Sequence, residues 1–183
     1  MQSRHMQFTF RPITLADLPL LHGWLSRTHV IEWWCEPQSL AETVEEYSTI
    51  VAGTPAHNCY LATLGDFGPI GFIQSYTPAA FHEEGWWLDE HDPGVRGIDQ
   101  FLANANQINQ GLGTILVRQF VASLFDEPSV TRIQTDPAPN NHRAIRCYEK
   151  AGFRAIGEID TLDGRALLMY CDRSKHVATN NNE

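Results

Sequence analysis

The sequence has little positive charge and no long hydrophobic run. Of its 183 residues, 13 are Lys or Arg and 22 are Asp or Glu, which gives a net charge of −9. Such an acidic chain is poorly suited to nucleic acid, whose phosphates require basic patches. No hydrophobic run approaches the length of a membrane span, and no signal peptide opens the chain. We therefore expect a cytoplasmic protein with neither a nucleic-acid nor a membrane partner.

Patterns typical of metal sites and disulfide frameworks are also missing. The four cysteines, Cys35, Cys59, Cys147 and Cys171, are far apart and form no C-x-x-C pair, and the eight histidines are dispersed. Scattered cysteines of this kind are typical of reduced thiols in a cytoplasmic protein. The sequence therefore predicts no metal site.

The ends of the chain differ in character from its middle. The opening "MQSRHM" resembles an expression-vector remnant with Met6 as the natural start, and residues 173–183 form a polar, aperiodic tail. Residues 7–172 show no repeat or linker. The whole sequence is 43% hydrophobic, and residues 7–172 are enough to bury a core, so we expect them to form a single domain.

Strand and helix patterns alternate along this domain. Hydrophobic residues at alternating positions or in short runs predict strands, and hydrophobic residues at helical spacing predict helices. The predicted strands are 6–14, 58–65, 69–78, 97–103, 130–137, 154–159 and 165–171, and the predicted helices are 15–30, 39–53, 113–125 and 141–152. The order indicates an α/β (α+β) fold, a mixed and largely antiparallel sheet flanked by helices.

Two local motifs suggest chemistry. Gly111 and Gly113 precede a long helix. Glycines in this position let backbone N–H groups surround a phosphate or pyrophosphate. Most glycine pairs of this kind, however, only allow a loop to turn. In "NNHRAIRCYEKAGF", Tyr148 shares a helix face with Ala144 and Ala151, one turn before the stop signal Gly152. On its own, Tyr148 is better interpreted as a packing residue with a solvated hydroxyl.

Together these motifs resemble the GNAT superfamily of acetyl-CoA-dependent N-acetyltransferases. The resemblance implies that acetyl-CoA is the cosubstrate and that Tyr148 is catalytic, protonating the departing thiolate. Ile108 stands where the family often has Gln or Arg, and Gln107 or Gln110 is expected to substitute for it. The implied cofactor-binding residues are Gln100, Phe101, Leu102, Gln110, Gly111, Leu112, Gly113, Thr114, Asn141 and Ala144.

Acidic residues and tryptophans lie side by side in "HVIEWWC" and "HEEGWWLDEHDPGVRGID". Carboxylates pair with ammonium groups, and indoles stack on sugar rings or attract cations, so these segments suit a polycationic ligand. A solvated acidic loop with core tryptophans is the plainer alternative. These segments, with "IQTDPAPNN" and "RAIRCYEKAGF", resemble aminoglycoside 6′-N-acetyltransferases from Phe8 to about Cys171. The implied substrate-binding residues are Trp34, Glu84, Trp86, Asp99, Asp136 and Asp163.

The resemblance implies acetylation of the 6′-amine of aminoglycosides by direct attack in a ternary complex, which confers resistance. Asp99 is the candidate to bind the substrate ammonium. Three roles stay open for it: taking the proton itself, relaying it through water, or only anchoring the ammonium. Asp136 could instead be a turn-capping residue before proline. Three other functions stay open: a siderophore-type acyltransferase acting on a hydroxylamino-lysine, a protein acetyltransferase, and a non-catalytic CoA- or drug-binding sensor. The sequence gives no preference between monomer and dimer.

Overall fold

The computed structural model describes residues 6–34 and 39–174. Cys35, most of the expected vector remnant and most of the polar tail lie outside these residues. The five α-helices of the described residues are α1 Leu18–Leu25, α2 Thr28–Ile31, α3 Leu40–Val51, α4 Leu112–Phe125 and α5 His142–Lys150. The strands are β1 Phe8–Pro12, β2 His57–Leu64, β3 Pro69–Tyr76, β4 Val95–Leu102, β5 Arg132–Thr135, β6 Arg154–Thr161 and β7 Gly164–Asp172.

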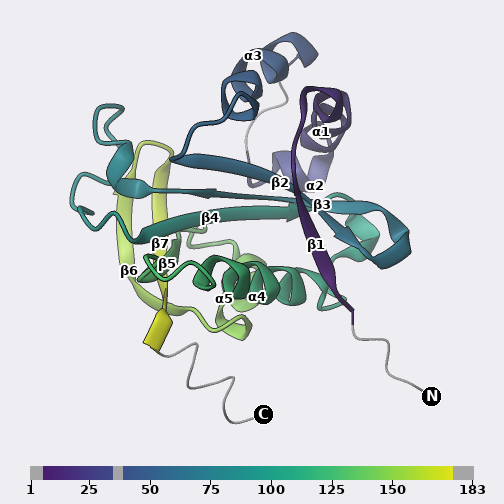
Figure 1. Ribbon diagram of the computed structural model, residues 1–183. Helices are drawn as coiled ribbons and strands as arrows, with labels where there is room; N and C mark the ends of the chain where they lie inside the picture. The colour runs from purple at the N-terminus through teal and green to yellow at the C-terminus, as the bar shows by residue number, and fades with distance from the viewer. Residues whose placement is uncertain (1–5, 35–38, 175–183) are drawn as a thin grey trace. The chain divides into compact units, whose positions relative to one another are not determined.

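The strands form one seven-stranded sheet in the order β1-β2-β3-β4-β5-β7-β6 (Figure 1). Strands β4 and β5 run parallel, whereas β1 with β2, β5 with β7, and β6 with β7 pair antiparallel. The predicted fold, a mixed and largely antiparallel sheet with flanking helices, is confirmed.

Most predicted elements occur close to their expected bounds, and two differ for clear reasons. The single helix predicted over residues 15–30 is a 3₁₀ turn followed by α1 and α2. Helix α1 ends at Leu25 and α2 begins at Thr28, because Arg27 between them has an extended backbone, with φ −82° and ψ 135°. Helix α4 begins at Leu112, slightly earlier than predicted, because Gly111 supplies the left-handed residue before it at φ 81°.

Contacts group the described residues into two compact units. One comprises the chain up to Gln74 with Gln100–Gln119, and the other comprises Ser75–Asp99 with the residues from Phe120 onward. Strands β3 and β4 each contribute residues to both units.

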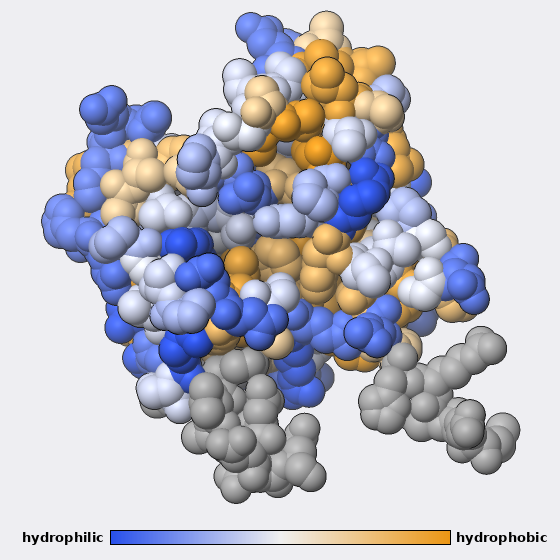
Figure 2. All heavy atoms as spheres, viewed as in Figure 1, coloured by the Kyte–Doolittle hydropathy of each residue, from blue (hydrophilic) through white to orange (hydrophobic). Residues whose placement is uncertain are grey.

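The first unit has an aromatic core. Phe72 of β3 and Phe101 of β4 stack with their ring centroids 5.4 Å apart, and Trp24 of α1 meets Phe101 edge-on at 6.5 Å. Helices α1 and α3 close over this cluster. They also leave some hydrophobic side chains partly exposed, and hydrophobic residues gather at this part of the surface in Figure 2; they include Leu15, Leu20, Leu40 and Val44.

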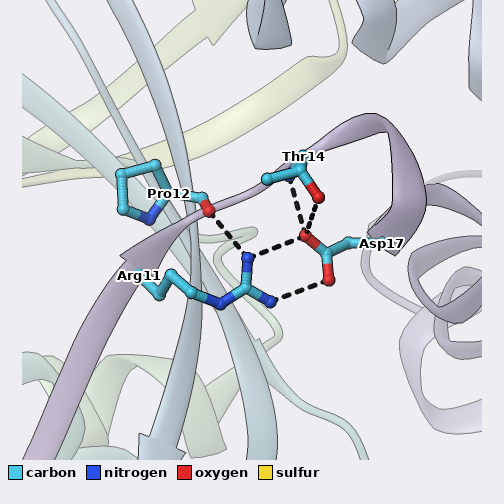
Figure 3. A network of polar contacts seen from close by, with 4 residues as sticks. All are labelled: Arg11, Pro12, Thr14 and Asp17. Carbon is cyan, nitrogen blue, oxygen red and sulfur yellow. Dashed lines mark hydrogen bonds and ion pairs between the residues drawn. The ribbon is translucent and has the colours of Figure 1, made fainter.

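The connection from β1 into the first helices is held by an ion pair. Both nitrogens at the tip of the Arg11 guanidinium donate to Asp17, at 2.7 and 2.9 Å, and the Thr14 amide and hydroxyl both donate to the same carboxylate at 2.7 Å (Figure 3). The hydrogen bond from Arg11 lowers the pKa of Asp17 well below its usual range. The Asp17 carboxylate therefore has two roles: it caps the 3₁₀ turn through Thr14, and it holds the end of β1 through Arg11.

Asp17→Asn should lower the free energy of unfolding at pH 7 by about 1–2 kcal/mol, because it removes charge-assisted hydrogen bonds. A folded-state pKa that lies below the unfolded value gives stability that is present above that value, near ~3.9, and lost as the pH falls. The difference between variant and parent in urea titrations should therefore shrink from pH 5 towards pH 2. Asp66→Asn, on an exposed turn, is the control and should change stability by less than about 0.5 kcal/mol. A difference independent of pH would contradict the role of the Asp17 charge.

Candidate active site

In the first unit, the end of β4 presents backbone groups. The Ala103 amide donates to the Ile70 carbonyl of β3 at 2.8 Å, so the alternation of a strand directs the amides of Gln100 and Leu102 to the opposite edge. The Leu102 carbonyl is fixed by the His29 ring at 2.9 Å, and Arg27 donates to the Ala103 carbonyl. Oriented N–H groups of this kind can polarise a carbonyl oxygen.

The glycine-rich loop leads directly into α4. Gly111 has φ 81°, a conformation that side chains rarely adopt, and its carbonyl accepts the Ile115 amide at 3.1 Å as the first helical hydrogen bond. The first-turn amides, from Leu112 onward, therefore point out of the helix N-terminus, where the helix dipole favours an anion. The side chain of Gln110 donates back to the Asn106 carbonyl. This bond braces the loop, so the Gln110 side chain is already engaged.

Trp34 lies beside the aromatic core of the first unit. Its ring meets Phe101 edge-on at 5.0 Å and Phe72 at 5.6 Å, and it stays partly exposed. The edge-on contacts fix the orientation of the indole, which leaves the exposed part available as a binding surface.

In the second unit, Asn141 caps α5. Its side-chain oxygen accepts a hydrogen bond from the Ala144 amide at 3.1 Å. The predicted cap is therefore present, and the cap bond leaves the side-chain N–H₂ group of the asparagine as a donor for a cofactor. Ala144 is partly exposed one turn into the helix, so its surface stays open to a ligand.

The end of α5 explains the position of Tyr148. The Phe153 amide donates to the Tyr148 carbonyl and the Gly152 amide to the Glu149 carbonyl, both at 3.0 Å, which is the bonding pattern of a Schellman motif. The hydrophobic contact expected in this motif is also present, since the rings of Tyr148 and Phe153 lie 5.3 Å apart. Gly152, at φ 105°, makes the motif possible. The stop signal of the helix thus orients the tyrosine ring.

The Tyr148 side chain is buried, at 4% exposure, and its hydroxyl is hydrogen-bonded to Thr135 of β5. Both hydroxyls can donate and accept, and the bond between them orients the phenol. Burial and the charge of Asp99 raise the pKa of Tyr148 well above its ordinary value. The phenol therefore stays protonated at neutral pH. The contact with Thr135 has no signal in the sequence.

Asp99 and Asp136 meet at the ends of the two parallel strands. Val95 to Gly97 of β4 are in register with Arg132 to Gln134 of β5. Continued by two residues, this register places Asp99 beside Asp136 on one face, where neighbouring strands are about 4.8 Å apart. Burial raises the pKa of Asp136 to about 8, and the negative charges of Asp99 and Asp163 add to the rise. Asp136 therefore holds a proton at neutral pH unless a cation arrives.

The remaining predicted substrate residues lie on the neighbouring surface of the second unit. Asp163 is exposed in the two-residue turn between β6 and β7, and Glu84 is exposed in the loop that follows β3. A Cβ on Gly85 would lie 3.8 Å from Leu162, so this loop and this turn are adjacent. Trp86 is partly buried in the loop, and its amide donates to the Phe81 carbonyl at 3.1 Å. The structure thus brings Asp99, Asp136 and Tyr148 together, with the two exposed acids nearby.

No group of three or more His, Cys, Asp or Glu within residues 6–34 and 39–174 could hold a metal ion. No helix in the same residues is long and hydrophobic enough to span a membrane.

Comparisons with known proteins agree with this geometry. Residues 14–161 match the model of the acetyltransferase (GNAT) domain, so the chain belongs to the GNAT acetyltransferase family. It is 49% identical over 174 residues to an aminoglycoside N(6′)-acetyltransferase of Klebsiella pneumoniae, covering 93% of this chain and 86% of that protein. A crystal structure of an aminoglycoside acetyltransferase with coenzyme A and kanamycin superimposes with a TM-score of 0.89 at 49% identity, covering 95% of this chain and 99% of that one.

A more distant relative is a lysine N-acyltransferase of Mycobacterium tuberculosis. It is 27% identical over 162 residues, which cover 88% of this chain and 75% of that protein. The lysine N-acyltransferase is therefore also similar to this chain, but at little more than half the identity of the aminoglycoside enzyme.

Asp136→Asn should change how stability depends on pH. A folded-state pKa raised to about 8 means that the stability of the protonated form is complete below the unfolded pKa and is lost as the pH rises through 8. In urea titrations from pH 5 to 9, the parent should lose stability relative to the variant up to about pH 8, and the difference should then level off. Asp89→Asn, in the exposed loop, should follow the parent. A parallel course for parent and Asp136→Asn would show that Asp136 is ionised throughout.

Proposed function

We propose that the protein is an aminoglycoside 6′-N-acetyltransferase, which transfers acetyl from acetyl-CoA to the 6′-amino group of aminoglycosides and so confers resistance. The observation that supports this most is the group of acidic side chains around Asp99 and Asp136, close to a buried tyrosine that retains its proton. Half-buried carboxyls suit the ammonium groups of a polycationic sugar. A neutral or anionic acceptor would leave them without partners.

Asp99 has the first role in the reaction. The substrate amine arrives as an ammonium ion, and it becomes a nucleophile only after losing a proton. Asp99 binds this ammonium and takes the proton directly or relays it through water. Asp136, its neighbour on the same face, holds a second ammonium or hydroxyl of the substrate. Arrival of the cation lowers the pKa of Asp136, because opposite charges now offset the repulsion between the carboxylates.

Tyr148 has the complementary role. Bound acetyl-CoA supplies the acetyl group as a thioester, and its sulfur must leave as a thiol. The Tyr148 hydroxyl, held by Thr135, donates a proton to that sulfur. The amides of Gln100 and Leu102 are suited to polarise the thioester carbonyl, and the N-terminus of α4 at Gly111 is suited to the pyrophosphate.

We also propose a cytoplasmic location, because acetyl-CoA is a metabolite of that compartment. The thiols of Cys59, Cys147 and Cys171, none of which is in a disulfide, are in keeping with it.

The function is tested by release of free thiol from acetyl-CoA with kanamycin, a hydroxylamino-lysine and a lysine-rich peptide as acceptors. Kanamycin should be the preferred acceptor, and NMR of the product should place the acetyl group on the 6′-nitrogen. Faster turnover with the hydroxylamino-lysine would favour the siderophore-type enzyme. Acetylation of another kanamycin amine would overturn the regiochemistry alone, and binding without thiol release would indicate a sensor.

Tyr148→Phe should lower kcat by about 10²–10⁴-fold, because it removes only the proton donor. The KM for acetyl-CoA should stay within a small factor of the parent value, since the ring and its contact with Phe153 are kept. Tyr170→Phe is the matched control. It loses a hydroxyl from β7 in the same unit, where the ring instead faces the Arg132 guanidinium at 4.3 Å, and it should keep the parent kcat. A loss confined to cofactor affinity would show that Tyr148 only packs.

A further inference from the structure

The side chain of Tyr76, the last residue of β3, lies where the side chain of any larger residue at Gly97 of β4 would have to be. A Cβ atom built on Gly97 would lie 2.1 Å from Cζ of Tyr76 and 2.6 Å from its hydroxyl oxygen. Contacts below about 3 Å do not occur at real Cβ atoms, so any larger residue at position 97 must displace the phenol. Gly97 has no left-handed backbone to explain it, since its φ is not positive. The glycine therefore serves the placement of the tyrosine hydroxyl.

The phenol is also fixed from the other side. Phe81 meets the ring edge-on at 6.2 Å, and Trp87 stacks on it at 6.4 Å with 26° between the planes. The Trp87 side chain hydrogen-bonds the Tyr76 hydroxyl, and because an indole can only donate, the tyrosine oxygen is the acceptor. Trp87 itself has φ 53°, an unfavourable backbone conformation for a bulky residue. This local strain is kept where the indole holds the phenol.

Tyr76 faces the acidic pair. Side chains two residues apart on a strand share a face, so the phenol over Gly97 lies on the face that carries Asp99. Gly97 is in register with Gln134, and Asp136 follows on that face of the adjacent strand. Burial, together with the charges of Asp99, Asp136 and Tyr148, raises the pKa of Tyr76 well above its ordinary value. The hydroxyl is therefore always protonated. Since its oxygen accepts from Trp87, its proton can be donated to a carboxylate.

We propose that Tyr76 is a positioning residue for acetyl transfer: its hydroxyl donates a hydrogen bond to Asp99 and stabilises the negative charge that receives the substrate ammonium. The inference rests on the proposed function. A hydrogen bond donated to Asp99 favours its ionised form, so Asp99 is the carboxylate of the pair and Asp136 keeps the proton. Gly97 and Trp87 act through Tyr76, by giving it space and by orienting its hydroxyl.

The test is Tyr76→Phe, which keeps the ring and removes the donor. A carboxylate that loses a hydrogen bond becomes a stronger base, so the acidic limb of kcat/KM for kanamycin should move up by roughly 0.5–1 pH unit. The KM for kanamycin at pH 7 should rise about 3–10-fold, as expected for one lost hydrogen bond on the binding carboxylate. The KM for acetyl-CoA should not change. Tyr170→Phe is again the control, and its pH profile should match that of the parent.

A lower melting temperature with an unmoved acidic limb would overturn the proposal and leave Tyr76 as a packing residue. The same shift can be read without turnover, from the pH titration of the Asp99 carboxyl carbon by NMR in parent and variant. An active parent whose Asp99 titrates unchanged in Tyr76→Phe contradicts this inference alone. A parent inactive on kanamycin contradicts the proposed function, and the NMR titration still decides the role of Tyr76.

A second pair of variants tests the contact itself. Gly97→Ala should reproduce the upward shift of the acidic limb, because the added methyl group displaces the phenol. In a Tyr76→Ala background the same substitution should change the pH profile little, since the space is then vacant. Gly157→Ala, on β6 with open space around its Cβ position, is the glycine control. A Gly97→Ala protein with the parent pH profile would show that the phenol does not need this space.

Discussion

Repulsion between the carboxyl groups of Asp99 and Asp136 is the constraint on which the rest of the site depends. Both are partly buried, and the parallel register of β4 and β5 places them side by side. Without a cation, one of them must keep a proton, and burial keeps it on Asp136 with a pKa of about 8. The site is thus poised for a ligand that brings several positive charges, because each ammonium relieves an unfavourable contact already present in the fold.

The groups that surround the two carboxyls are uncharged hydrogen-bond donors, which leave the repulsion between the carboxyls in place. Tyr148 is buried and Tyr76 is partly buried, and their hydroxyls are hydrogen-bonded to Thr135 and Trp87, respectively. The raised pKa of each phenol keeps its proton in place at neutral pH. Neutral groups can approach the carboxyls without neutralising them, whereas a lysine or arginine would compete with the substrate. The ring of Tyr148 is oriented by the end of α5, and that of Tyr76 by Gly97. Both positions come from backbone features rather than from flexible side chains.

The sequence predicted the fold, and its motifs singled out Asp99, Asp136 and Tyr148, whose catalytic and binding roles stay predictions. Periodicity gave the strands closely, and the capping residues Asn141 and Gly152 gave the ends of α5 because caps depend on local conformation. The break between α1 and α2 was missed, since it depends on the extended backbone of Arg27, and arginine is an ordinary helix residue by propensity. Thr135 and Tyr76 were missed because their roles arise from contacts across the sheet. Gly97 did leave a signal, as a glycine inside a strand often marks the close approach of another group.

The most direct measurement of the central claim is the number of protons released when kanamycin binds at pH 7. It is obtained by calorimetry in buffers of different ionisation enthalpy, for the parent and for Asp136→Asn. Protonation changes on the antibiotic itself are common to both proteins and cancel in the difference. If binding ionises Asp136, the parent should release up to about one proton more than the variant. Equal release from the two proteins would show that Asp136 carries no proton before the substrate arrives, and would contradict the account.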